Sequence, residues 1–196
     1  MSAELLIAFA LFAFAASITP GPNNLMLLAS GVNHGFRATL PHLFGVCFGF
    51  VVLLLAVGLG LAELFARWPL LDGLLRVAGS AYLLWLAWRI AGSGSPQAGS
   101  NTSAPMGFWA AAGFQWLNPK AWMMAVAAYT AYLPARSFWA VLAVALLFAL
   151  INLPCLSTWT LLGSRLRRWM AVGRRQQVFN LTMGGLLVLS LWPMLR

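Results

Sequence analysis

Six long runs of apolar residues dominate this sequence and restrict what the chain can fold into. Each run has about 20 residues or more, the length that an α-helix needs to cross the hydrocarbon core of a bilayer. Because backbone groups in lipid must be satisfied within each segment, the runs predict an all-α integral membrane protein with six transmembrane helices. The predicted spans are residues 5–31, 38–62, 69–91, 107–132, 137–162 and 176–194.

The charged residues are few and mostly basic, which predicts the orientation of the chain. Only 8% of the 196 residues are charged, and the net charge is +9. Short loops rich in Lys and Arg face the cytoplasm, so the cytoplasmic side is predicted to hold Arg37, Arg89, Arg165, Arg167, Arg168, Arg174 and Arg175. Both termini are then expected on the outer side. Nucleic-acid binding is disfavoured, because no predicted soluble segment is large enough to form a basic groove.

A stretch rich in Gly, Ser and Pro divides the chain near its midpoint. Residues 92–106 are predicted to form a flexible cytoplasmic linker between a first three-helix repeat, 1–91, and a second, 107–196. Since each half has an odd number of spans, related halves would be inserted in opposite directions, as in many transporters. Pro22 and Pro119 interrupt the first helix of each half. Helices one and four are therefore predicted to be broken at proline.

The two proline breaks predict a binding site at the middle of the membrane. Proline opens the turn before it, so carbonyl groups before each break and N–H groups after it lack intrahelical partners. Pro22 and Asn118 suit the start of the second half-helices, because proline favours the first turn and asparagine the N-cap. Helix N-termini attract carboxylates and carbonyl ends attract ammonium groups, so an amino-acid zwitterion would fit. The alternative is that the prolines only bend the helices.

Lys120 lies near the middle of the fourth predicted span. It is about 18 Å from either end of that span at 1.5 Å per residue, too far for its side chain to reach an interface. A charge at this depth indicates a functional site. No acidic residue is predicted at the same depth, so the ammonium group either caps the carbonyls freed by a break or pairs with a bound anion. The second alternative favours a substrate with a carboxylate and disfavours a cationic one.

The candidate substrate-binding residues lie at the breaks or are polar residues at similar depth. They are Thr19, Pro20, Gly21, Pro22, Asn23, Asn24, Gln115, Asn118, Pro119, Lys120 and Asn152. Asn152 could equally well belong to a bend before Pro154. Lys120 and His42 are the candidates for a proton carrier, although the position of His42 at the end of the second span favours a solvated turn residue. Gly45 and Gly49 form a G-x-x-x-G pattern that predicts close helix packing. No catalytic residue, metal site or cofactor is expected, since metal-ligand spacing is absent from the sequence.

Three stretches resemble the LysE/RhtB family of bacterial amino-acid exporters. They begin ITPGPNNLMLL, AGSAYLLWLAW and FWAAAGFQWLNPKAW, and they follow the family's order over most of the chain. The resemblance implies an inner-membrane protein that exports amino acids using the proton motive force. Its motif residues carry over as Thr19, Pro20, Gly21, Pro22, Asn23, Asn118, Pro119 and Lys120. The stretches are most similar to the cysteine and O-acetylserine exporters, followed by the homoserine and threonine types.

The resemblance and the lysine together predict a transporter of small neutral amino acids that works by alternating access. Basic-amino-acid exporters of this family tend not to have lysine directly after the Asn-Pro pair. The expected partners are the amino acid, protons, the bilayer and a second copy in a possible homodimer. The alternatives are a passive channel or an exporter of another small solute, and a membrane-embedded lipid-modifying enzyme. The enzyme is disfavoured because the sequence lacks the grouped acids and histidines that such chemistry needs.

Overall fold

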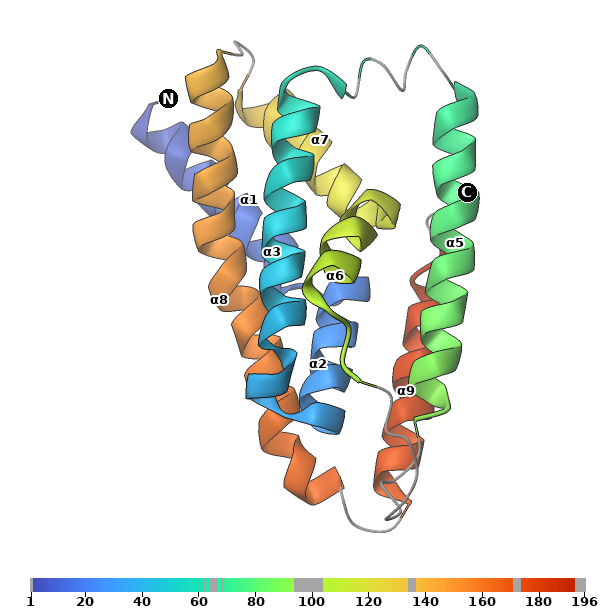
Figure 1. Ribbon diagram of the computed structural model, residues 1–196. Helices are drawn as coiled ribbons and strands as arrows, with labels where there is room; N and C mark the ends of the chain where they lie inside the picture. Colours follow the sequence, from blue (N-terminus) through green and yellow to red (C-terminus); the bar gives the residue numbers. More distant parts are fainter. Residues whose placement is uncertain are drawn as a thin grey trace.

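The computed structural model describes residues 2–61, 63, 67, 69–93, 104–133, 137–170 and 174–192, and within them it is a bundle of α-helices (Figure 1). Most of the predicted linker, residues 94–103, lies outside the described residues. The helices are α1 (Ala3–Ile18), α2 (Pro22–His34), α3 (Phe36–Gly58), α5 (Pro69–Ala91), α6 (Phe108–Phe114), the 3-10 helix η1 (Gln115–Leu117), α7 (Pro119–Tyr132), α8 (Phe138–Met170) and α9 (Arg175–Leu189).

Several of these helices are long and apolar enough to cross a membrane. In the described part of the chain they are Phe36–Gly58, Gly73–Ala91 and Phe138–Met170, and α1 with α2 makes a fourth candidate that is bent by 52°. The predicted fourth span is divided among α6, η1 and α7, and the sixth corresponds to α9 with 15 residues, so neither forms one long helix. The all-helical architecture is confirmed with three or four candidate membrane spans in the described part of the chain, and the bend in the first span lies where the prolines predict it.

The last turns of α8 correct the predicted position of three arginines. The predicted fifth span ends at residue 162, but α8 continues to Met170, so Arg165, Arg167 and Arg168 lie on a helix and not in a loop. The end of α8 lies at the same end of the bundle as the starts of α3 and α9 and the end of α5 (Figure 1). We call this the arginine end. It carries Arg37, Arg89, Arg165, Arg167, Arg168, Arg174 and Arg175.

Glycines allow two pairs of helices to pack backbone against backbone. A Cβ atom on Gly163 of α8 would lie 2.2 Å from the carbonyl oxygen of Leu28 in α2. In α3, Cβ atoms on Gly45 and Gly49 would lie 2.2 Å and 2.4 Å from backbone oxygens of α6. The close packing predicted from the G-x-x-x-G pattern is therefore confirmed. These contacts hold α2 and α6, which flank the two breaks, against the long helices α8 and α3.

We expect Gly163→Ala to destabilise the protein, because the new methyl group would collide with the α2 backbone. Overpacking of this kind typically costs about 1–3 kcal/mol, and a backbone carbonyl cannot rotate away as a side chain can. The measurement is the thermal unfolding midpoint of the purified protein in detergent. Gly185→Ala is the matched control, since a Cβ atom there meets nothing within 4 Å. An equal midpoint for the two variants would contradict the packing described here.

Candidate functional site

The two helix breaks lie in the middle of the bundle and their second halves point in opposite directions. From its start at Pro22, α2 runs toward the arginine end, and from its start at Pro119, α7 runs toward the other end (Figure 1). Asn118 is the N-cap of α7, and its side-chain oxygen accepts a hydrogen bond of 3.2 Å from the backbone N–H of Lys120. The predicted positions of Pro22 and Asn118 at these helix starts are confirmed.

The carbonyl groups freed at the end of α1 all receive donors from side chains. The amide of Asn24 donates to the carbonyls of Ser17 and Thr19, each at 2.8 Å. The indole N–H of Trp159, from α8, donates to the carbonyl of Ile18 at 3.1 Å. Because unsatisfied backbone groups are costly at membrane depth, these donors allow the chain to remain open at residues 19–21.

Lys120 crosses from the second break to the first. Its Nζ atom donates to the carbonyl oxygen of Thr19 at 2.7 Å, to Oγ1 of Thr19 at 2.9 Å and to the carbonyl oxygen of Pro20 at 3.3 Å. Gly21 makes room for the lysine, since a Cβ atom there would lie 2.7 Å from Cδ of Lys120. Of the two partners that the sequence left open, the carbonyl cluster is the one observed. We call these contacts the Lys120 cap.

A second contact between the breaks is a reciprocal pair of amides. Nδ2 of Asn23 donates to Oε1 of Gln115 at 2.8 Å, and Nε2 of Gln115 donates back to Oδ1 of Asn23 at 3.1 Å. Gln115 is fully buried and also donates to the carbonyl of Ala111 at 2.9 Å. The amide pair and the Lys120 cap therefore join the first half of the chain to the second at the same depth.

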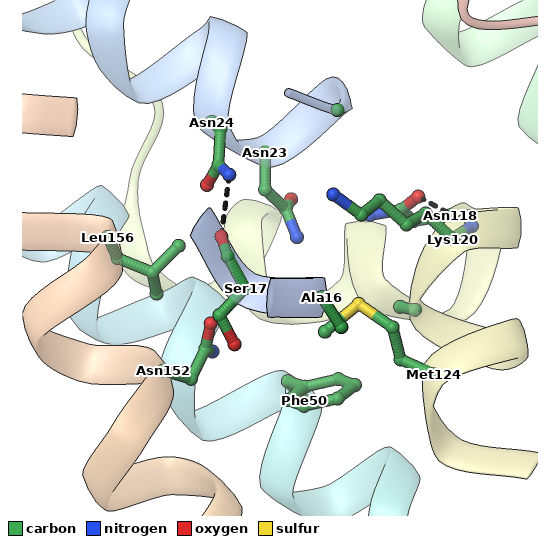
Figure 2. Close-up of a pocket in the computed structure, with 12 residues that line it drawn as sticks. Ala16, Ser17, Asn23, Asn24, Phe50, Asn118, Lys120, Met124, Asn152 and Leu156 are labelled. Atoms are coloured by element: carbon green, nitrogen blue, oxygen red, sulfur yellow. Dashed lines mark hydrogen bonds between the residues drawn. The ribbon is translucent and has the colours of Figure 1, made fainter. Parts of the chain in front are cut away.

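A small cavity of about 30 Å³ lies between the breaks (Figure 2). That volume holds about one or two water molecules, so an amino acid can enter only if the broken helices separate. Figure 2 shows Asn23 and Lys120 facing the cavity from two sides, with Ser17 and Asn152 nearby. Six predicted site residues line it: Gly21, Asn23, Asn24, Asn118, Lys120 and Asn152. The other lining residues are Ala16, Ser17, Phe50, Ala121, Met124 and Leu156.

The remaining predicted residues lie beside this cavity or away from it. Thr19 and Pro20 contribute the oxygens of the Lys120 cap, and Pro22 and Pro119 open their helices. Gln115 reaches the cavity residue Asn23 through the amide pair. His42 lines a different cavity, nearer the arginine end. Within the described residues, no group of three or more His, Cys, Asp or Glu side chains could hold a metal ion.

The two half-helix starts differ in a way that the sequence did not predict. The N-terminus of α7 is capped by Asn118, whereas the N-cap of α2 is Gly21, which offers no side-chain oxygen to the first N–H groups. Those N–H groups belong to the part of α2 that lines the cavity. An uncapped helix start attracts an anion. Of the two helix starts, the N-terminus of α2 is therefore the one that can receive a carboxylate.

Sequence reasoning also missed two sets of polar residues. Ser17 lines the cavity, and its buried hydroxyl has no hydrogen-bond partner among the described residues. Nearer the arginine end, Asn33 of α2 accepts from Gln176 at 2.8 Å and exchanges hydrogen bonds with Asn180. Gln176 and Asn180 are buried and four residues apart in α9. Their spacing on one helix face was the signal that could have revealed them.

The amino-acid sequence agrees with a known protein family over most of the chain. The sequence pattern of the family described as LysE type translocator matches residues 14–190. The chain belongs to the LysE family. This family consists of membrane transporters, so the lipid-modifying enzyme considered from the sequence is wrong, and the family resemblance is confirmed.

Curated LysE-family relatives from bacteria match the chain over most of its length. One is the cysteine/O-acetylserine efflux protein of Klebsiella pneumoniae, 36% identical over 96% of this chain and 95% of the relative. Another, from Escherichia coli O1:K1, is 36% identical over 96% of each chain. A third, from Salmonella choleraesuis, is 38% identical over 86% of this chain and 87% of the relative. No solved structure matches the chain.

Proposed function

We propose that this LysE-family protein exports small neutral amino acids or their derivatives, of the cysteine and O-acetylserine or homoserine and threonine type. The observation that carries the proposal is the cavity between the breaks. It brings the ammonium group of Lys120 and the uncapped N-terminus of α2 together, and none of the described residues lining it is acidic. Such a site attracts a carboxylate and repels a cationic side chain. The relatives named as cysteine/O-acetylserine efflux proteins support the same substrate class.

In the proposed site the substrate replaces the contacts of the Lys120 cap. The substrate carboxylate binds the N–H groups at the start of α2 together with the ammonium group of Lys120. The substrate ammonium group then takes the place of Lys120 at the carbonyls of Thr19 and Pro20, which already accept from a cation of the same kind. Lys120 exchanges neutral carbonyl oxygens for the substrate carboxylate, and those carbonyl oxygens exchange one ammonium group for another. The binding of a zwitterion therefore leaves no unpaired charge in the membrane.

The geometry supports alternating access between two inverted repeats, 1–91 and 107–196, with six spans. The half-helices α2 and α7 both start in the middle part of the bundle and run in opposite directions (Figure 1), which is the arrangement that inverted halves produce. The Lys120 cap and the amide pair both join the two repeats across the cavity. Breaking these contacts allows the cavity to open, and re-forming them closes it around the substrate or behind it.

The membrane placement and the driving force belong to the same proposal. The arginine end faces the cytoplasm by the positive-inside rule, which puts the protein in the bacterial inner membrane with both termini periplasmic. The proton motive force drives export, with Lys120 and His42 as the candidate proton carriers. Homodimer formation remains a prediction from the sequence.

Counterflow in proteoliposomes tests the proposal. Vesicles containing the purified protein are loaded with unlabelled cysteine, O-acetylserine, homoserine, threonine or lysine and placed in the same labelled compound with and without a pH gradient. We expect saturable counterflow for the neutral compounds, stimulation by the gradient and none for lysine. A passive channel would give flux that does not saturate. Absence of counterflow for all neutral compounds would overturn the proposed function.

A further inference from the structure

A second and larger cavity lies between the helix breaks and the arginine end. Its volume is about 330 Å³, within the range of small-molecule sites and about tenfold larger than the cavity at the breaks. Residues of α2, α3, α5 and α6 line it, including Met26 and Ser30 of α2. Met26 lies only three residues after Asn23, which lines the first cavity. One side of α2 therefore connects the two cavities.

His42 of α3 is an unexplained polar group in the wall of this cavity. Its side chain is 2% exposed, and neither ring nitrogen has a hydrogen-bond partner among the described residues. Leaving a buried polar group without a partner typically costs about 1–3 kcal/mol, so such groups usually meet a ligand or ordered water. By contrast, the hydroxyl groups of the neighbouring residues Ser30 and Thr39 form a hydrogen bond with each other, with 2.9 Å between their oxygen atoms.

The opposite wall of the cavity provides a fixed positive charge. Arg89 of α5 holds its guanidinium over the ring of Trp85, with Cζ 5.0 Å from the ring centroid. Stacking on the aromatic face leaves the edge of the guanidinium available for a planar, two-oxygen group such as a carboxylate. Arg89 is the one Lys or Arg among the described lining residues, and none of those residues is acidic.

We propose that this cavity is a second amino-acid binding site, a receiving site in which Arg89 holds the substrate carboxylate and His42 hydrogen-bonds the same molecule before it moves along α2 to the breaks. The inference rests on the proposed function for the identity of the ligand. It adds a substrate-binding role for Arg89 and changes the expected role of His42 from proton carrier to ligand. The larger volume explains why the substrate can bind here while the cavity at the breaks is closed.

Two variants separate this site from the one at Lys120. Counterflow of labelled L-cysteine is measured against concentration in proteoliposomes, with the arginine end facing the labelled compartment. Replacing Arg89 by glutamine (R89Q) removes a charge-assisted hydrogen bond, so we expect KM to rise about tenfold while the maximal rate is retained. H42F should also raise KM, because it removes both ring nitrogens. R37Q is the matched control, since Arg37 is exposed at the same end and does not line the cavity.

Direct binding gives a second measurement that does not depend on transport. In nanodiscs, a Lys120→Met protein should retain saturable binding of labelled L-cysteine, and adding R89Q should weaken that binding about tenfold. An unchanged KM for R89Q, or equal binding with and without R89Q in the Lys120→Met protein, would overturn the receiving site and leave the proposed function intact. Absence of both counterflow and binding of any neutral amino acid by the wild-type protein would overturn both.

Discussion

We expect Lys120→Met to abolish counterflow of the transported amino acid while the protein still folds. Methionine keeps the apolar stem and removes the ammonium group. In the proposed site that group binds the substrate carboxylate, and truncating one partner of a buried charge pair typically costs about 2–5 kcal/mol of binding energy, or about 30- to 5,000-fold in affinity. The cost to folding is small, because the carbonyl of Thr19 keeps its hydrogen bond from Asn24. The measurement is the initial counterflow rate at equal protein density.

The control for this variant is Arg165→Met, which removes one positive charge from an exposed position on α8. We expect it to transport at the wild-type rate. Both proteins should elute as single symmetric peaks from a sizing column, which shows that any loss is functional. If the Lys120→Met protein transports at the wild-type rate, Lys120 only caps the carbonyls of Thr19 and Pro20, and the carboxylate site proposed here is wrong.

The second large effect is expected at the amide pair. The losses of stability caused by substituting Asn23 and Gln115 should not add up in the double variant. Asn23→Leu leaves the fully buried amide of Gln115 with one partner fewer, and Gln115→Leu does the same to Asn23. Each single substitution should therefore lower stability by about 1–3 kcal/mol. The double variant, which leaves neither amide unpaired, should lose less than the sum of the two, by about 1–2 kcal/mol. All three should transport poorly, because the contact joins the two repeats beside the cavity.

The measurement is a double-mutant cycle on thermal unfolding in detergent, with counterflow measured on the same preparations. Gln177→Leu is the matched control, since Gln177 lies exposed on α9 and its amide can be replaced without leaving a buried partner. Additive losses in the cycle would show that Asn23 and Gln115 do not act as a pair. Wild-type counterflow in the double variant would show that the pair is dispensable for transport.

The sequence predicted the breaks and their helix starts because these depend on local chemistry. Pro22 and Asn118 act through the few residues next to them, so their roles follow from the chain itself. The close approach of α3 to α6 was also predictable, because Gly45 and Gly49 mark a helix face without side chains. The first span is bent where the prolines predict it, and six of the predicted site residues line one cavity.

The remaining features depend on how distant segments meet. The Lys120 cap joins residues about a hundred positions apart, and apolar runs carry no polar face that would show which sides of two helices touch. The same reason explains why Ser17 was missed and why the cavity of His42 was not foreseen. The uncapped start of α2 also became visible only in the structure, where Gly21 is the N-cap and no described side chain hydrogen-bonds to this helix start.

Competition between substrate analogues tests the proposed site most directly. It shows whether the site binds both the carboxylate and the ammonium group of its substrate. Counterflow of the labelled amino acid is measured with three unlabelled competitors: the same amino acid, its decarboxylated amine and its deaminated acid. We expect inhibition by the amino acid and at least about tenfold weaker inhibition by each analogue, since each loses a charge-assisted contact. Equal inhibition by the amine would contradict it, because the start of α2 and Lys120 would then not bind a carboxylate.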